Sequence, residues 1–389
     1  MLSYWEKQSL LHYDCIILGS GIVGLSTAIS LKEKAPRKRI LVLERGLLPT
    51  GASTKNAGFA CIGSLTEILD DLEHMTPEEV VALVQLRRKG LQLLRSRIGD
   101  DRMQYRENGS YELISEIEMP ALQRLDEVNA LLSGILPGPA FSMADERLAS
   151  FGFNGTYVKS LVKNNYEGEL HTGMMMRTLI DVAIERGIEI KTGCNVAWID
   201  ETGKGAEVYV ASAGARLEPH AAANEAGITF TASQAAVCTN AFAQTLLPEV
   251  NVTPGRGQVL ITSAVKGLPF KGVFHFDKGY YYFRELNGRV LFGGGRNMDV
   301  AGETTTSIAL QESIQQNLEE KLRTLILPHH PFTIEDRWAG IMAFGPTKQP
   351  LVQPHSDHIF FAVRMGGMGV AIGSEIGRQL AAMMLQNAS

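Results

Sequence analysis

The sequence lacks the features that mark several large classes of protein. No apolar run in its 389 residues reaches the roughly 18 to 20 residues that a membrane-spanning helix needs. Lysine and arginine are scattered and the formal net charge is -5, so we expect neither nucleic acid nor an anionic membrane as a partner. Glu6 and Lys7 stand where a signal peptide would be apolar. We therefore predict a cytoplasmic protein.

Cysteine is scarce, and no pattern links the four that are present. Neither a Cys-x-x-Cys pair nor a Cys/His spacing typical of metal ligands occurs around Cys15, Cys61, Cys194 and Cys238. No Ser/His/Asp arrangement stands out either. We therefore predict reduced thiols and no metal site. Hydrophobic residues make up 45% of the chain, which suffices for the core of two domains or of one elaborated α/β domain.

Glycine, in contrast, is concentrated near both ends of the sequence. The first cluster lies in "YDCIILGSGIVGLSTAISLKEK", where residues 15–18 form a short apolar run typical of a buried parallel strand. Gly19 permits a tight turn, and Gly21 lets the backbone approach a pyrophosphate. Gly24 allows a helix to pack closely on the strand. This segment predicts a strand, a phosphate-binding loop and a helix in succession.

The next segment completes a dinucleotide-binding unit. The helix opens at Ile22 and Val23, so its free N–H groups and positive dipole end face the phosphates. A second strand, residues 39–43, ends at Glu44, twenty residues after Gly24. A carboxylate at this spacing binds the ribose 2′-hydroxyl of adenosine, which argues against NADP. The spacing leaves NAD and FAD as alternatives.

The segment after Glu44 favours FAD. It reads "RGLLPTGASTKNAGFACIGS" and is rich in small, hydrogen-bonding residues that can follow an extended ligand. It resembles the loop of the D-amino acid oxidase (DAO) superfamily of flavoproteins, in which an (S/T)xxNAG stretch lies beside the ribityl chain and the isoalloxazine ring. A surface loop without a ligand is the alternative. The cofactor-binding residues predicted here are Arg45, Ser53, Thr54, Lys55, Asn56, Ala57 and Gly58.

Later segments resemble the same superfamily. Residues 168–200 are similar to its helix, third parallel strand and following strand, and residues 235–248 to its next strand and small-residue turn. "PGRGQ" and "RWAGIMAFGPTKQP" resemble its entry into the substrate domain and its closing segment. "SYWEK" and the Trp338-Ala-Gly pattern lean toward the glycine oxidase, D-amino acid dehydrogenase and γ-glutamylputrescine oxidoreductase branches. From this resemblance we predict cofactor contacts by Val196, Thr239 and Asn240.

The second glycine cluster, "FFAVRMGGMGVAIG", follows a strand predicted at residues 360–363. By resemblance, this loop lies against the flavin pyrimidine. A helix N-terminus there would stabilise negative charge at flavin N1 and C2=O, and Arg364 adds to it or faces solvent. The cofactor-binding residues predicted in the loop are Gly366, Gly367, Met368 and Gly369.

We predict an α/β fold in which a Rossmann-like FAD domain is interleaved with an α+β substrate domain. The FAD domain comprises residues 10–75, 150–250 and 336–389, and the substrate domain comprises residues 76–149 and 251–335. A capping box at residues 76–79 begins a helix that reaches about Ile98, and a second helix is expected at 119–132. Residues 251–299 predict antiparallel strands, with a hairpin turn at Asn287-Gly288. Residues 211–232 predict a hairpin excursion to which we assign no function.

Candidate substrate residues come from "GYYYFRELNGR". Alternation along a strand puts Tyr280, Tyr282 and Arg284 on one face, where they line a polar substrate site or, alternatively, the aromatic rings pack in the core and Arg284 is solvated at an edge. The superfamily's amino acid oxidases bind the substrate carboxylate with an arginine in the segment 339–345, where this chain has Met342. Either Arg284 or Arg364 holds the carboxylate instead, or the substrate is an amine.

Three functions remain open at this stage. The first is FAD-dependent oxidation of a C–N bond in an amine or amino acid, with oxygen or a quinone or electron-transfer partner as acceptor. The second is oxidation of a 2-hydroxy acid, with His171 or His275 as the base. The third is a dinucleotide-binding module without catalysis. We predict non-covalent FAD, and Cys61 is the first suspect if the flavin is attached.

Overall fold

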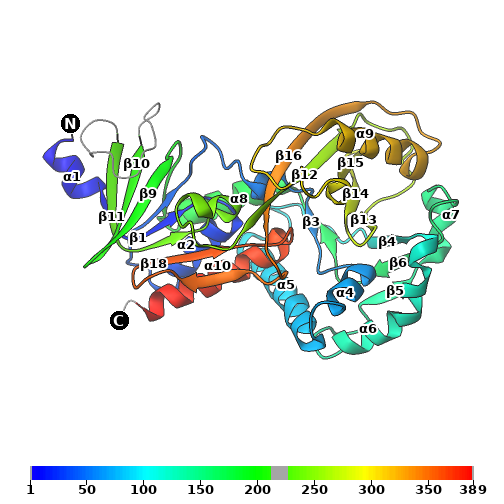
Figure 1. Cartoon of the computed structure of the whole chain (residues 1–389), viewed down its shortest axis with the longest axis horizontal. Helices are drawn as coiled ribbons and strands as arrows, with labels where there is room; N and C mark the ends of the chain where they lie inside the picture. The colour runs from blue at the N-terminus through cyan, green and yellow to red at the C-terminus, as the bar shows by residue number, and fades with distance from the viewer. Residues whose placement is uncertain (1, 212–226, 388–389) are drawn as a thin grey trace.

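A computed structural model of the chain describes residues 2–211 and 227–387, and its strands form two large sheets (Figure 1). The first sheet has the strand order β17-β18-β11-β1-β2-β8, and β9 and β10 extend it from β11. The pairs from β18 to β8 along this order are all parallel. Its strands are β1 (His12–Leu18), β2 (Ile40–Leu43), β8 (Glu189–Lys191), β9 (Val196–Thr202), β10 (Gly205–Ala211), β11 (Gly227–Val237), β17 (Leu351–Pro354) and β18 (Ile359–Val363).

Both faces of the first sheet are buried, as the apolar run at residues 15–18 predicted. Cys15 and Ile17 pack against the long helices, whereas Ile16 and Leu18 face the residues of β9, β10 and the turn after β11. The helices on the first face are α2 (Ile22–Lys34), α5 (Pro77–Ile98), α8 (Thr172–Glu185) and α10 (Gly369–Gln386). The predicted βαβ unit and the strand before the second glycine cluster are therefore confirmed.

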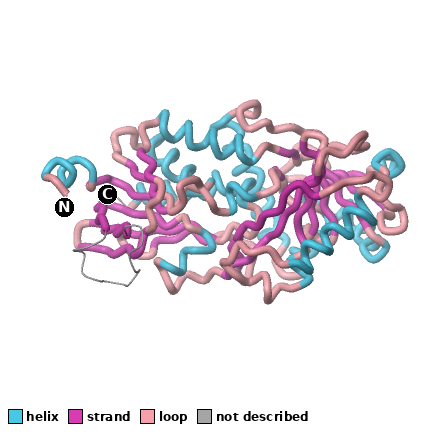
Figure 2. The backbone as a smooth tube through the Cα atoms, turned by 90° about the horizontal axis from the view of Figure 1, so that it is seen from above, coloured by secondary structure: helices cyan, strands magenta, loops and turns pink. Residues whose placement is uncertain are grey.

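The second sheet is largely antiparallel and has the order β16-β12-β15-β14-β13-β4-β6-β5. Only the pair β13–β4 in it is parallel among the residues described. Its strands are β4 (Ser110–Ile114), β5 (Phe141–Met143), β6 (Ser160–Asn164), β12 (Thr253–Thr262), β13 (Val273–Phe276), β14 (Tyr281–Leu286), β15 (Arg289–Gly294) and β16 (Ile334–Phe344). Figure 2 shows the strands in two groups, one toward each end of the molecule.

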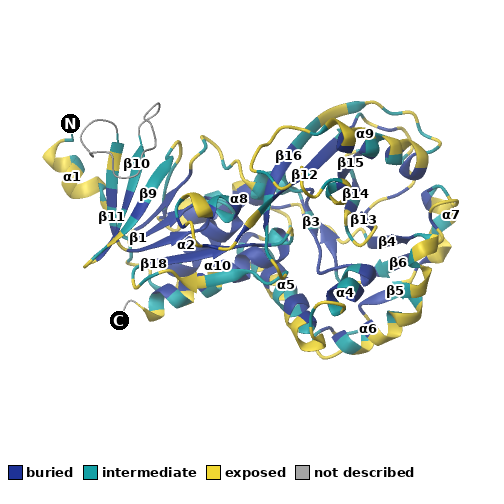
Figure 3. Ribbon diagram, in the orientation of Figure 1, coloured by how far each residue is buried: buried dark blue, intermediate teal, exposed yellow. Residues whose placement is uncertain are grey.

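An aromatic core covers one face of the second sheet. The rings of Phe274 and Phe283 stack with centroids 4.7 Å apart, and Phe153 and Phe270 contact both of them edge-to-face. Figure 3 shows that the central strands of both sheets and the helices α2 and α10 are largely buried. The predicted hairpin is confirmed, since Asn287 and Gly288 both have positive φ angles, 52° and 76°.

Shorter elements connect the two sheets. The capping box and the helix ending at Ile98 are confirmed in α5, and the helix predicted at 119–132 is a 3₁₀ stretch, Glu116–Arg124, followed by α6 (Leu125–Leu132). The remaining helices and strands are α1 (Tyr4–Leu10), α3 (Ala52–Lys55), α4 (Leu65–Leu72), α7 (Leu148–Phe151), α9 (Glu312–Lys321), β3 (Phe59–Ala60) and β7 (Gly168–Glu169). Other 3₁₀ turns are Asp145–Arg147, Asn240–Thr245 and Arg296–Met298, and a π-helical turn spans Leu322–Ile326.

The chain passes between the sheets several times. β6 and β16 both belong to the second sheet, although the predicted boundaries place most of their residues in the FAD domain. Where the two domains divide stays a prediction. β10 and β11 pair antiparallel around the predicted excursion, of which residues 212–226 lie outside the described residues. No helix in the described parts is long and apolar enough to cross a membrane.

Candidate active site

A cavity of about 700 Å³ lies where the two sheets meet. Leu18 and Leu43, at the carboxyl ends of β1 and β2, form part of its wall, and Val259 and Ile341 of the second sheet form another part. The predicted cofactor residues that line it are Gly19, Gly21, Ile22, Val23, Glu44, Arg45, Ser53, Lys55, Asn56, Ala57, Val196, Thr239, Asn240, Gly366, Gly367, Met368 and Gly369. Tyr280, Tyr282 and Met342 line it as well, whereas Gly24, Thr54, Gly58, Arg284 and Arg364 do not.

The first glycine cluster forms one end of the cavity. Gly19 has a φ of +102°, and a Cβ there would lie 2.9 Å from the carbonyl oxygen of Cys238. A Cβ at Gly24 would lie 1.9 Å from the carbonyl oxygen of Gly19, so any side chain at position 24 would push α2 away from the loop. A Cβ at Gly21 would lie 2.9 Å from Ser53 Oγ. Each glycine therefore keeps backbone close to a neighbour.

Glu44 is fixed at this end by three hydrogen bonds. Its Oε2 accepts from the backbone N–H of Ser20 at 3.1 Å and from Ser20 Oγ at 2.7 Å, and its Oε1 accepts from the N–H of Gly46 at 3.0 Å. The side chain is largely buried but lines the cavity. A carboxylate has about four lone-pair sites, so Glu44 keeps acceptor capacity for a sugar hydroxyl.

The loop from Gly51 to Gly58 is tied to α2, to α8 and to β16 of the second sheet. Ser53 Oγ accepts from the N–H of Ile22 at 3.0 Å, and Asn56 Oδ1 accepts from Gly58 N–H and from Thr172 Oγ1, both at 2.9 Å. Trp338 Nε1 of β16 donates to the Lys55 carbonyl at 3.0 Å. Sequence reasoning missed the partner Thr172, because a threonine opening a helix carries no signal of a contact more than a hundred residues away.

Arg284 lies behind this loop instead of in the cavity. It is 5% exposed, and its Nη1 donates to the carbonyls of Gly58 at 3.1 Å and Leu170 at 2.8 Å. Its Nε lies 3.5 Å from Glu169 Oε2. Burial lowers the pKa of Arg284, and the Glu169 carboxylate opposes that shift. The guanidinium thus holds the loop and β7 together.

The second glycine cluster forms the other end of the cavity. Gly366 and Gly367 have φ angles of 57° and 83°, which turn the chain from β18 into α10. Arg364, also at positive φ, points away from the cavity: its Nε donates to the Gln349 carbonyl at 2.8 Å. Its backbone N–H donates to Asn240 Oδ1 at 3.0 Å, which joins the two cavity-lining turns.

An aromatic and thioether wall stands next to this loop. The rings of Phe59 and Tyr282 meet edge-to-face with centroids 5.5 Å apart. Burial raises the pKa of the Tyr282 hydroxyl to about 12, so it is protonated near neutral pH. The side chain of Met342 reaches both Gly257 and Gly367, since an added Cβ would lie 2.9 Å from its Cε at Gly257 and 3.6 Å from its Sδ at Gly367.

Charged side chains of α4 and two loops line another part of the cavity. Lys278 Nζ lies 2.6 Å from Asp70 Oδ1, and Lys348 pairs with the Asp71 carboxylate. Burial raises the pKa of Asp71, and the Lys348 ammonium opposes it. Sequence reasoning missed these pairs, which join residues more than two hundred positions apart.

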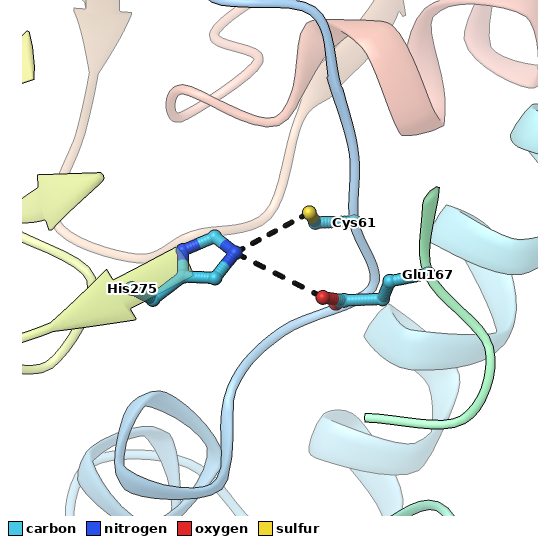
Figure 4. A group of neighbouring side chains, drawn as sticks. All are labelled: Cys61, Glu167 and His275. Atoms are coloured by element: carbon cyan, nitrogen blue, oxygen red, sulfur yellow. Dashed lines mark hydrogen bonds and ion pairs between the residues drawn. The ribbon is translucent and has the colours of Figure 1, made fainter. Parts of the chain in front are cut away.

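Cys61, Glu167 and His275 form a buried cluster next to the wall (Figure 4). His275 Nε2 faces both Cys61 Sγ at 3.4 Å and Glu167 Oε2 at 3.9 Å. Glu167 is already bonded by two backbone N–H groups and Ser110 Oγ, and burial raises the pKa of Cys61 well above its ordinary value. Burial thus favours the protonated thiol, and three hydrogen bonds already engage the Glu167 carboxylate.

Neither histidine of the hydroxy-acid hypothesis reaches the cavity. The ring of Phe59, which lines the cavity, lies against the ring of His275 with centroids 5.1 Å apart. His171 Nδ1 accepts from the N–H of Met174 and caps α8. Among the histidines of the described chain only His74 lines the cavity, and its side chain is exposed.

The cavity suits an extended dinucleotide with a flavin. It joins a phosphate-binding glycine loop, a carboxylate at ribose spacing and a second glycine loop at a helix N-terminus. Thr239 Oγ1, which belongs to a cavity-lining residue, is buried and has no hydrogen-bond partner among the described residues. A buried hydroxyl without a partner costs free energy, so a ligand that bonds to it would be stabilised.

A family model described as DAO, FAD dependent oxidoreductase, matches residues 14–383. The chain belongs to this family. FAD is therefore implied as its cofactor. A search of curated protein sequences finds no match.

Solved structures with the same fold are distant in sequence. L-proline dehydrogenase from P. horikoshii has 15% identity and a TM-score of 0.75, covering 97% of this chain and 94% of that one. Glycine oxidase from Geobacillus kaustophilus has 20% identity and a TM-score of 0.73, with 97% and 95% covered. Iminodiacetate oxidase from Chelativorans sp. BNC1 has 18% identity and a TM-score of 0.71, with 96% and 95% covered. At such identities the likeness shows the fold alone.

Proposed function

We propose that this DAO-family protein is a flavoenzyme that oxidises the C–N bond of an amine or amino acid. The observation that carries the proposal is the wall at the second glycine loop, where Tyr280, Tyr282 and Met342 line the cavity. In support, the proteins of similar fold include a dehydrogenase of proline and oxidases of glycine and iminodiacetate.

FAD would be held by residues along the whole cavity. The loop at Gly21 and the N-terminus of α2 would bind the pyrophosphate, Glu44 the ribose, and the loop at Asn56 the ribityl chain. Bound FAD supplies an acceptor for the two electrons and the hydrogen that leave the substrate carbon. The N–H groups of Gly369 and Val370, the first two of α10, have no partner within the helix and favour negative charge at this end, whereas those of Ala371 and Ile372 bond to the Met368 carbonyl.

The wall itself would orient the substrate and control its protonation. Phe59, Met342 and Phe344 offer apolar surface, which disfavours an ammonium and so favours the neutral amine that the chemistry needs. The Tyr282 hydroxyl, protonated near neutral pH, can donate a hydrogen bond to the substrate. No protein nucleophile is required, which agrees with the protonated state of the buried Cys61 thiol.

Oxidation of a 2-hydroxy acid is less well supported, since His171 and His275 both lie outside the cavity. The test is anaerobic bleaching of the flavin by matched pairs: alanine and lactate, glycine and glycolate, with proline and propylamine in addition. We expect bleaching by at least one amine or amino acid and by neither hydroxy acid. Bleaching by the hydroxy acids alone would overturn the proposal.

We further propose that FAD is bound without a covalent link, in a cytoplasmic protein. Cys61, the thiol nearest to the predicted flavin loop in sequence, does not line the cavity, and its raised pKa disfavours attack as a thiolate. Acid precipitation should release all yellow colour into the supernatant. A yellow pellet would contradict the proposal. The electron acceptor, oxygen or a quinone or electron-transfer partner, is distinguished by reoxidation of the reduced protein in air.

A further inference from the structure

Five cationic side chains line the cavity, and most of them are already engaged: Arg45, Lys55, Lys278, Arg296 and Lys348. The guanidinium of Arg45 lies over the Phe242 ring, 4.4 Å from its centroid, at the nucleotide end next to Glu44. Lys278 and Lys348 are paired with aspartates. Of this set, Lys55 and Arg296 are the cations that lie away from the nucleotide end and have no ion pair with a carboxylate among the described residues.

Arg296 presents an unused guanidinium. It makes no hydrogen bond or ion pair with any residue that the structure describes, and it is only partly exposed. Its Cζ lies 4.2 Å from the centroid of the Phe344 ring. The other arginines near the second sheet's cavity edge, Arg256 and Arg284, are buried and have their donors occupied by Glu303 and by backbone carbonyls. Arg45 has no ion pair among the described residues either, but it lies beside Glu44 at the nucleotide end, so Arg296 is the unpaired guanidinium at the substrate wall.

The backbone makes room for this stack beside the reacting wall. A Cβ at Gly255 would lie 2.4 Å from the Phe344 ring and 3.7 Å from Arg296 Cδ, so only glycine permits the ring and the guanidinium to lie there. Gly255 is the partner of Met342 in the pairing of β12 with β16. The N–H of Gly295 donates to the Tyr280 carbonyl at 3.2 Å. Arg296 thus lies among the residues that form the wall.

We propose that Arg296 binds the carboxylate of the substrate, which makes the substrate an amino acid or N-substituted amino acid instead of a simple amine. This inference rests on the function proposed above. A guanidinium has paired donors that match a carboxylate, and stacking on Phe344 fixes its plane before the substrate arrives. Phe344 and Met342 then pack against the rest of the substrate.

Lys55 is the competing cation. Its side chain runs along β16, with Cβ 3.0 Å and Cδ 3.8 Å from a Cβ placed on Gly340. An ammonium is a point charge on a flexible stem and does not select a planar anion in a fixed orientation. Arg296 is therefore preferred, and a Lys55 variant enters the test as the alternative.

The experiment measures binding of propanoate and of propanamide, its uncharged counterpart of the same shape, to the flavin-loaded protein. Titration of the visible flavin spectrum and the shift of the melting temperature give two independent readouts. Wild-type protein should bind propanoate more tightly than propanamide. Arg296→Met should weaken propanoate by roughly 10-fold to 100-fold and leave propanamide unchanged. Arg296→Lys should lie between the two and keeps the inference testable if the methionine variant fails to fold.

Two controls separate a bond from a general effect of charge. Arg289 of β15 forms an ion pair with Glu335 outside the cavity. Arg289→Met also removes one positive charge from the protein, and it should leave propanoate binding unchanged. Lys55→Met should reduce it less than Arg296→Met. Equal propanoate affinity in wild type and Arg296→Met, or a larger loss in Lys55→Met, overturns the inference. If Arg296→Met loses propanoate while no amine or amino acid bleaches the flavin, the carboxylate site stands and the proposed C–N chemistry fails.

Discussion

Two arginines that lie close together in the sequence have opposite surroundings. Arg284 on β14 has its guanidinium enclosed by the carbonyls of Gly58 and Leu170, while the guanidinium of Arg296 after β15 stacks on the Phe344 ring and bonds to no residue that the structure describes. The N–H groups of Arg284 thus hold backbone carbonyls in place, whereas those of Arg296 remain available for a ligand. Charge alone therefore does not mark a binding residue; the donors that remain free do.

Replacing Arg284 should mainly affect stability. Arg284→Met would remove the side-chain donor of the Leu170 carbonyl and one of the two donors of the Gly58 carbonyl, and would leave the buried Glu169 carboxylate without its nearby cation, at a cost of about 3–5 kcal/mol. We expect a lower unfolding midpoint in urea and a smaller fraction of protein with bound FAD. The KM of the FAD-loaded fraction should be unchanged. A raised KM at normal stability would instead place Arg284 against the substrate.

Replacing Gly21 should block the cofactor. In Gly21→Val the new Cβ would lie within 2.9 Å of Ser53 Oγ, and overpacking of about 1–3 kcal/mol would weaken FAD roughly 10-fold to 100-fold. Gly134→Val is the matched control, because nothing lies within 4 Å of a Cβ at that position. Equilibrium titration of apoprotein with FAD measures the effect. Equal affinity in the two variants would refute the placement of the loop.

At the scale of elements, a buried carboxylate joins α4 to the second sheet. Glu112 of β4 accepts hydrogen bonds from Ser64 Oγ, which also caps α4, and from Thr66. Burial raises the pKa of Glu112 to about 7, against the hydrogen bonds that favour its charged form. α4 carries acidic side chains that line the cavity. The first residues of this helix are therefore linked to the protonation of Glu112 on β4.

This linkage predicts a pH dependence of stability. The ordinary pKa of the unfolded carboxyl is 4.5, so between about pH 4.5 and pH 7 unfolding releases a proton and stability falls as the pH rises. Above pH 7 the free energy of unfolding has fallen by up to about 3 kcal/mol through this group, since each unit of pKa is worth about 1.36 kcal/mol. Glu112→Gln carries no titrating group and should lack this part of the slope.

Unfolding midpoints in urea at pH 5 and pH 8 measure the difference. Glu116→Gln, an exposed position two residues after β4, is the control and should keep the slope of the wild type. If Glu112→Gln and Glu116→Gln show the same change between the two pH values, Glu112 does not titrate in this range.

Elements were predictable where their signals are local. The glycine cluster at Gly19 and Asn287-Gly288 each dictate backbone geometry within a few residues, so the βαβ unit and the hairpin followed from sequence. No strand was predicted at β4, and the residues of β6 were predicted with the FAD domain, because only the pairing of β4 with β13 and with β6 reveals that both strands join the second sheet. Arg296 was missed for the same reason, since its stacking partner Phe344 is distant in sequence.

At the scale of the whole molecule, the cavity has walls from both sheets, so a ligand in it stabilises both. For apoprotein we expect one melting transition that rises with FAD concentration, by about 2.7 kcal/mol of stability at a hundred times the dissociation constant. Riboflavin and NAD are the comparisons, and each should shift the transition less than FAD at equal concentration. A larger shift with NAD would favour a dinucleotide-binding module without flavin chemistry.

The strand order of the first sheet also has a consequence for biosynthesis. β11 lies between β1 and β18, and β18 is translated long after β1 and the loop at Gly19. Until residues 359–363 have left the ribosome, β11 of the nascent chain therefore lacks its neighbouring strand β18, and this apolar edge of the sheet stays unpaired. Such long-range pairing is slow, and the incomplete edge is prone to aggregate. We expect the newly made chain to depend on chaperones and to capture its flavin only after translation has passed β18.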